Sequence, residues 1–164
     1  VVTCFSATKT FNLAGLQACT VVFPNNKLKD EFDKWWFSKD IHRNNSFSSV
    51  AMEVAYNEGE EWLNQMLPYI SNNFDFVVEY CKENIPKIKT YAPDATYLMW
   101  LDCRALNLTN TELEKFMIEK AKLGLNSGTA FNKELSGFMR LNVACPKSVL
   151  KQALDQLKKA VDEL

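Results

Sequence analysis

The chain has 164 residues and a nearly balanced charge, with 19 Lys and Arg against 20 Asp and Glu, and a formal net charge of −1 at pH 7. Nucleic-acid binding usually requires a clustered positive surface, so the absence of a basic block argues against a nucleic-acid partner. No apolar run approaches the length of a membrane span, and no membrane association is expected. An apolar fraction of 47% is ample for the core of one globular domain or slightly more.

The first half of the chain predicts two strands around a turn, followed by helices. Apolar, β-branched runs at 1–5 and 18–23 are typical of strands. Residues 27–37 carry large apolar side chains at helical spacing. A long helical region is expected over 48–84, with interruptions at Gly59 and at Pro68, where the proline either ends the helix or kinks it.

The second half alternates strands and helices. Strands are predicted at 88–91 and 97–101. The next helix has a capping box, Thr109 with Glu112, and Gly124 is expected to end it in the left-handed conformation.

Two further β segments are expected around Phe131 and Arg140, before a last helix that follows residues 146–148. This helix is amphipathic, because one face carries only apolar residues: Val149, Leu150, Ala153, Leu154, Leu157, Ala160, Val161 and Leu164. A sheet covered by such helices predicts an α/β or α+β fold.

The five cysteines are odd in number and scattered, and none forms a C-x-x-C pair. All have apolar sequence neighbours, so buried, reduced thiols in a cytoplasmic protein are expected. The only histidine, His42, lies in a polar stretch and is expected to be a solvated loop residue. With one histidine and no clustered cysteines, no metal site is predicted.

One lysine has a setting that suits covalent chemistry. Lys9 follows a strand and opens a turn of small residues. A lysine amine becomes nucleophilic only where it is held rigidly and partly desolvated. The alternative is an ordinary surface lysine at a strand end.

Residues 6–17 resemble the Schiff-base lysine segment of pyridoxal-phosphate enzymes of the class I and II aminotransferase superfamily. Residues 95–102 resemble the family's small-domain strand, and residues 127–131 with 137–142 resemble its carboxylate-binding segment. The branch that the chain is most similar to is the cystathionine β-lyases of the MalY and PatB type.

The resemblance implies the carboxyl-terminal part of a fold type I enzyme, which is an α/β fold. Residues 1–70 would be the end of the large domain, with the Schiff-base lysine and the interdomain helix, and residues 71–164 the small domain. The chain opens at Val1 in mid-strand character, so a piece of a longer homodimeric enzyme is expected, inactive alone and with apolar surface exposed. A short protein that starts at Val1 is the competing interpretation.

The resemblance also assigns roles. Lys9 would bind pyridoxal phosphate covalently and act as the general base, and Ser6 would donate to the cofactor phosphate, unless its hydroxyl only stabilises the turn. Arg140 would bind the substrate α-carboxylate, unless it is a strand arginine in a surface ion pair. The chain departs from the family pattern at Gln17, where many members have an arginine, and at Asn132, where they tend to have a glycine.

Three functions remain open. The first is a C–S β-lyase that converts a sulfur-containing amino acid to a thiol, pyruvate and ammonia. The second is an aminotransferase on the same scaffold, and the third is a non-catalytic module that uses the small domain only.

Overall fold

The computed structural model describes residues 1–41 and 43–164, and the chain divides into two compact units, Val1–Met66 and Leu67–Leu164. The expectation for His42 lies outside the described residues. Helix α3 (Glu60–Asn84) begins in the first unit and ends in the second. The predicted division into large and small domains at residues 70 and 71 stays a prediction.

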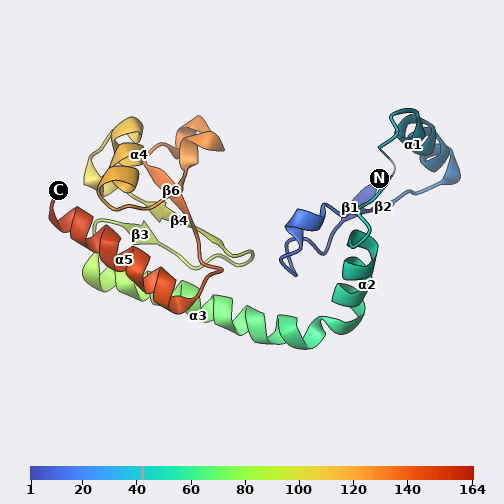
Figure 1. Ribbon diagram of the computed structural model, residues 1–164. Helices are drawn as coiled ribbons and strands as arrows, with labels where there is room; N and C mark the ends of the chain where they lie inside the picture. Colours follow the sequence, from blue (N-terminus) through green and yellow to red (C-terminus); the bar gives the residue numbers. More distant parts are fainter. Residues whose placement is uncertain (42) are drawn as a thin grey trace. The chain divides into compact units, whose positions relative to one another are not determined.

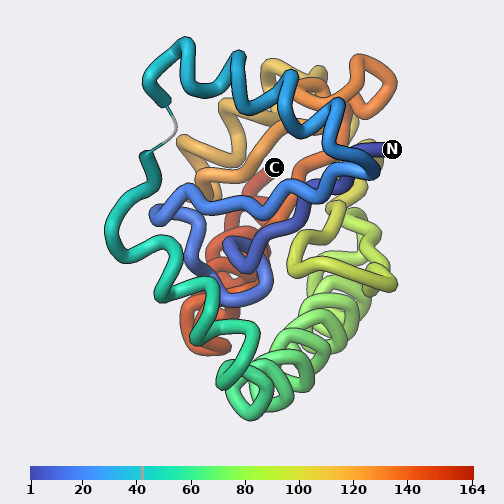
Figure 2. Tube along the Cα trace, turned by 90° about the vertical axis from the view of Figure 1, so that its right-hand side faces the viewer, coloured from blue at the N-terminus to red at the C-terminus, as the bar shows by residue number. Residues whose placement is uncertain are grey.

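The first unit is a two-stranded sheet followed by helices (Figure 1). Before α3, its elements are β1 (Thr3–Phe5), the 3-10 helix η1 (Ala14–Leu16), β2 (Thr20–Val22), α1 (Asn26–Ser38) and α2 (Ser48–Glu58). The strands are antiparallel, with Cys4 opposite Val21, and Figure 2 shows the two blue segments running side by side. The predicted strands and first helix are confirmed.

The first unit buries few apolar side chains. Ala7, Ala18 and Ala55 are its only described hydrophobic residues that are buried, and helix α1 has none. Large apolar side chains such as Trp35 and Phe47 are exposed. The expected exposed apolar surface is therefore present.

The second unit is a four-stranded antiparallel sheet with helices packed on it (Figure 1). After α3, its elements are β3 (Lys89–Thr90), β4 (Leu98–Asp102), η2 (Arg104–Leu106), α4 (Asn110–Glu119), β5 (Asn126–Ser127), η3 (Gly128–Ala130), η4 (Lys133–Leu135), β6 (Phe138–Asn142) and α5 (Lys147–Asp162). The strand order is β3-β4-β6-β5. Helices α3 and α5 run side by side, where the Tyr80 hydroxyl donates to Asp155 at 2.7 Å.

The two central strands, β4 and β6, bury one face and leave the other half-buried or exposed. Met99 and Leu101 of β4 and Met139 and Leu141 of β6 are buried, whereas the alternate positions are half-buried or exposed. Helix α5 completes this core with the side chains of Leu150, Leu154, Leu157, Ala160 and Val161. Val149 and Leu164, which were also predicted for the apolar face, are exposed, and Leu164 lies after the end of the helix.

Two helix-end predictions have opposite outcomes. The capping box is confirmed, since the Thr109 side chain accepts from the Glu112 N–H and the Glu112 carboxylate accepts from the Thr109 N–H at 2.9 Å. The prediction for Gly124 was wrong: α4 ends earlier, and Lys122 has the left-handed conformation, with φ 58°. The Leu123 N–H donates to the Met117 carbonyl at 2.8 Å and closes the helix there.

Pro68 does not end the helix, because α3 continues through it, and the alternative of a kink at Pro68 stays a prediction. Proline removes one helical hydrogen bond, but the following turns bury Ile70, Phe74 and Val77 on one face, and this burial outweighs the loss. Gly59 does separate α2 from α3.

We expect Asn73→Ala to lower the free energy of unfolding by about 1–3 kcal/mol. The Asn73 amide is 1% exposed and donates to the carbonyls of Val143, at 2.9 Å, and Cys145, at 3.1 Å, in the segment after β6. The substitution leaves these acceptors without their donor. Urea denaturation should show a lower midpoint with an unchanged slope. The exposed neighbour Asn72 is the matched control, and an equal effect of Asn72→Ala would contradict this account.

Candidate functional site

Lys9 lies in a turn between β1 and η1 that backbone hydrogen bonds hold. The Phe11 N–H donates to the Ala7 carbonyl and the Leu13 N–H donates to the Thr8 carbonyl, both at 2.9 Å. Ala7 is fully buried, whereas Lys9 is exposed. In the part of the chain that the structure describes, the Lys9 ammonium group has no hydrogen bond or ion pair. The turn therefore fixes the backbone and leaves the amine available.

Ser6 is bonded within the same turn. Its hydroxyl contacts the Ala18 carbonyl and the Thr8 hydroxyl, and it accepts from the Thr8 N–H at 3.2 Å. A hydroxyl has one proton to donate, so these contacts agree with the turn-stabilising alternative. The phosphate-binding role of Ser6 stays a prediction.

Gln17, where the chain departs from the family pattern, is exposed and has the left-handed conformation, with φ 52°. Its backbone N–H donates to the Ala14 carbonyl and closes η1.

An aromatic cluster that the sequence analysis did not identify supports the lysine turn. The Phe11 ring lies between Tyr56 and Trp62, with centroids 6.0 Å apart in both pairs. Gly59 permits this approach, because a Cβ there would lie 2.5 Å from the Phe11 ring. The only sequence signal was Gly59 itself, which was interpreted as a helix break alone.

Arg140 lies on β6 and is half-buried on the face of the sheet opposite the core. Its Nη2 donates to Asn126 Oδ1 at 2.9 Å, and its guanidinium carbon lies 4.5 Å from the centroid of the Phe131 ring. Trp100 is its cross-strand neighbour on β4. Among the described residues no carboxylate pairs with Arg140, so the alternative of a surface ion pair does not hold there.

The segment 126–137, before strand β6, consists mainly of turns and 3-10 helices. The prediction of a β segment around Phe131 was wrong, because strand β5 ends at Ser127 and the 3-10 helix η3 follows it. Asn110 explains this, since its amide nitrogen lies 3.2 Å from the hydroxyls of both Ser127 and Thr129 and fixes them in a turn. Nothing in the local sequence indicated this role for Asn110.

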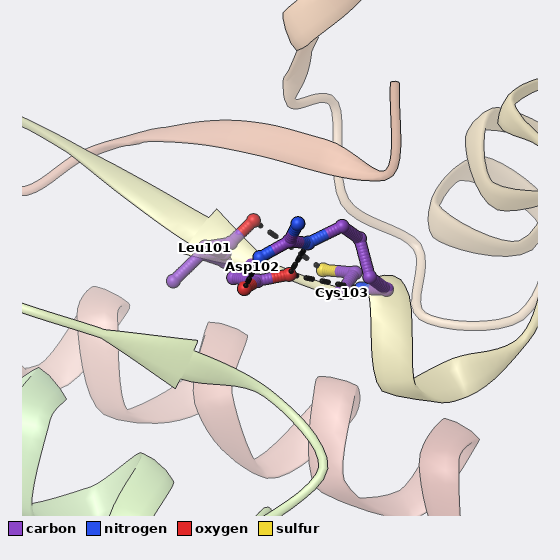
Figure 3. Close-up of polar contacts among 4 residues, drawn as sticks. Leu101, Asp102 and Cys103 are labelled. Atoms are coloured by element: carbon purple, nitrogen blue, oxygen red, sulfur yellow. Dashed lines mark hydrogen bonds and ion pairs between the residues drawn. The ribbon is translucent and has the colours of Figure 1, made fainter. Parts of the chain in front are cut away.

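Gly137, the residue directly before β6, has the left-handed backbone conformation, with φ 84°. The Arg104 side chain lies against it and over the Phe138 ring, 4.8 Å from the centroid. Arg104 also makes paired hydrogen bonds to Asp102, at 2.9 and 2.8 Å. Figure 3 shows Asp102 at the end of β4 with dashed lines to its carboxylate. The hydrogen bonds from Arg104 lower the pKa of the Asp102 carboxyl.

The five cysteines are free thiols, but their burial differs from the prediction. Cys4 and Cys19 are exposed, because both lie in the first unit, which has little core to bury them. Burial raises the pKa of Cys81 to about 11 and that of Cys103 to about 12. Cys103 Sγ lies 3.7 Å from the Leu101 carbonyl oxygen (Figure 3). These two thiols are therefore protonated core residues at neutral pH, not nucleophiles.

Across residues 1–41 and 43–164, no group of three or more His, Cys, Asp and Glu side chains is placed to hold a metal ion. The described helices include none whose length and apolar content would carry it across a bilayer.

Comparison with known proteins gives one family. Residues 1–157 match the family model described as aminotransferase class I and II. The chain is 38% identical over 165 residues to the Bacillus subtilis (strain 168) protein named cystathionine beta-lyase PatB, and the match covers 98% of this chain and 41% of that protein.

Solved structures agree with this match. A pyridoxal-phosphate-bound protein from Clostridium difficile 630, provisionally described as an aminotransferase, has a TM-score of 0.93 and 46% identity, covering 98% of this chain and 41% of its own. The pyridoxal-phosphate-bound C–S lyase from Staphylococcus hominis has a TM-score of 0.85 and 30% identity, covering 99% and 42%. The chain thus spans about two fifths of the length of these relatives.

We expect Gly137→Ala to lower the free energy of unfolding by at least ~1 kcal/mol, because φ 84° strains any side chain and the new Cβ would lie 2.7 Å from Arg104 Cγ. Gly124→Ala is the matched control, since a Cβ added there would meet no heavy atom within 4 Å and the φ of Gly124 is ordinary. That control should be neutral or slightly stabilising. Denaturant unfolding measures both, and equal stabilities of the two variants would refute the close approach at Gly137.

Proposed function

Because the chain belongs to the class I and II aminotransferase family, we propose that it is part of a pyridoxal-phosphate-dependent C–S β-lyase of the cystathionine β-lyase type. The full-length enzyme takes a sulfur-containing amino acid and releases a thiol, pyruvate and ammonia. The observation that carries this proposal is the similarity along nearly the whole chain to the Bacillus subtilis cystathionine β-lyase. The similarity to the Staphylococcus hominis C–S lyase supports it.

The residues present suit the cofactor. The exposed Lys9 amine has no partner in the described part of the chain and stands on a rigid turn, which suits covalent attachment to an aldehyde carbon. Ser6 lies three residues before Lys9 in the same turn, and in the proposal its hydroxyl leaves its contacts within the turn to donate to the cofactor phosphate. When bound, pyridoxal phosphate supplies an electron-accepting ring that stabilises negative charge at the substrate α-carbon.

Lys9 has two tasks in this proposal. It holds the cofactor until an amino acid takes its place, and its free amine then removes the α-proton onto Nζ. The electron pair left at the α-carbon forms the second bond between the α- and β-carbons as the thiolate leaves, and the thiolate takes the proton from Nζ. Water then hydrolyses what remains to pyruvate and ammonia. The turn at Ala7 and Phe11 fixes the backbone that carries the amine during both tasks.

Arg140 binds the substrate. Its planar guanidinium can donate two parallel hydrogen bonds to an α-carboxylate, which fixes the orientation of the bound amino acid. In the described chain its charge has no carboxylate partner. A carboxylate ligand would therefore complete an interaction that the fold itself leaves open.

An aminotransferase is the second candidate, and the similarity to the Clostridium difficile protein favours it. It requires sustained amino-group transfer to a keto acid without pyruvate release. A homodimer in the cytoplasm is proposed for the full-length protein in either case.

In the full-length enzyme, Lys9→Ala should abolish the visible absorbance of the bound cofactor and reduce pyruvate release from cystathionine by at least ~100-fold. The absorbance spectrum and a coupled pyruvate assay measure the two effects. The matched control is Lys34→Ala, an exposed lysine of α1, which should leave both unchanged. If Lys9→Ala changed neither, the non-catalytic module would be the better explanation.

Arg140→Lys should lower kcat/KM roughly 10- to 100-fold, mainly through KM, because lysine keeps the charge but loses the paired hydrogen bonds. The cofactor absorbance should persist, since Arg140 acts on the substrate. Steady-state kinetics with cystathionine test this, and an unchanged KM would argue against Arg140 as the carboxylate-binding residue.

A further inference from the structure

We propose that Phe131 and Asn126 are positioning residues that fix the Arg140 guanidinium for a substrate carboxylate. The inference rests on the proposed function and concerns how its carboxylate-binding site is assembled. Each of the two residues contacts a different part of the guanidinium: Phe131 lies against its face, and Asn126 accepts from one edge.

The Phe131 ring is itself held in place. Its centroid lies 5.6 Å from that of Trp100, at an interplanar angle of 84°, which is an edge-to-face contact. Trp100 faces Arg140 across the β4–β6 pair. The ring therefore contacts both an aromatic residue of the neighbouring strand and the Arg140 guanidinium.

The loop that carries Phe131 is fixed at its base. The Asn110 amide bonds to the hydroxyls of Ser127 and Thr129, and the Gly137 N–H lies 3.4 Å from Asn110 Oδ1. A hydrogen-bonded turn of this kind loses less conformational entropy when a ligand binds than a free loop does. The position of Phe131 is therefore prepared before any carboxylate arrives.

Core packing does not account for Phe131, because the side chain is 52% exposed. A cation over an aromatic face is stabilised by the ring quadrupole, and the ring also shields that face from water. Asn126 takes one N–H, and among the described residues the other guanidinium donors have no partner, so a carboxylate can accept a pair of them. Without these contacts the long arginine side chain would sample many rotamers.

The test uses the full-length, cofactor-loaded enzyme and a probe that cannot react with the cofactor. The probe is 3-(methylthio)propanoate, which has a carboxylate but no amino group, and its uncharged amide is the matched ligand. Calorimetry measures both dissociation constants. The variants are Phe131→Leu, Phe131→Tyr and Asn126→Ala, and Tyr91→Leu is the control, because Tyr91 is a 78% exposed aromatic residue next to β3.

Phe131→Leu and Asn126→Ala should each weaken binding of the acid about five- to thirtyfold and leave amide binding unchanged. KM for cystathionine should rise by a similar factor while kcat stays within about twofold, since the substrate is held less well but reacts by the same step. Phe131→Tyr restores the ring and should restore acid binding. Tyr91→Leu should match the unsubstituted enzyme.

Acid binding that is unchanged in both Phe131→Leu and Asn126→Ala would overturn the inference. So would an equal loss for acid and amide, because that pattern indicates a general packing defect. Failure of the proposed function would give a different result: the unsubstituted enzyme would show no cofactor absorbance and would release no pyruvate.

Discussion

The pleat of the two central strands of the second unit is the constraint on which the rest depends. Met99, Leu101, Met139 and Leu141 face the helices, and each such buried side chain contributes about 1.5–3 kcal/mol. A slip of one residue would expose the two β6 members of this set and force the Arg140 charge into the core, where an unpaired ion is far too unfavourable. The hydrophobic register of β6 therefore determines the direction in which Arg140 points.

The lysine turn is built in a different way. The first unit has little apolar burial, so the position of Lys9 comes from hydrogen bonds of Ser6 and the backbone and from the aromatic contacts of Phe11. Such local interactions fix a backbone well over a few residues but contribute less to global stability than a packed core. Lys9 and Arg140 thus have different physical foundations: turn geometry sets the backbone at Lys9, and burial sets the strand register at Arg140.

The sequence predicted the features whose causes are local and missed those whose causes are distant. The Thr109–Glu112 capping box lies within one helical turn, so its residues are sufficient to identify it. The prediction that Gly124 ends helix α4 was wrong, because Lys122 adopts the left-handed conformation two residues earlier and closes the helix there. Asn110 contacts residues 17 and 19 positions away, and such pairings leave no mark in a single sequence. Lys9 and Arg140 could be proposed as site residues only because their surrounding segments resemble those of a known family.

The chain is similar both to a cystathionine β-lyase and to a protein provisionally described as an aminotransferase, and the proposed chemistry explains why. Both reactions begin with an amino acid whose carboxylate is held and whose α-proton is removed. In the proposal, Arg140 performs the first task and Lys9 the second, and neither depends on what happens next at the β-carbon. The reactions separate only when a lyase expels the β-substituent and a transferase returns the proton elsewhere. A segment that carries the shared steps should therefore resemble both classes, and selection for either reaction would preserve the same lysine turn and the same arginine strand.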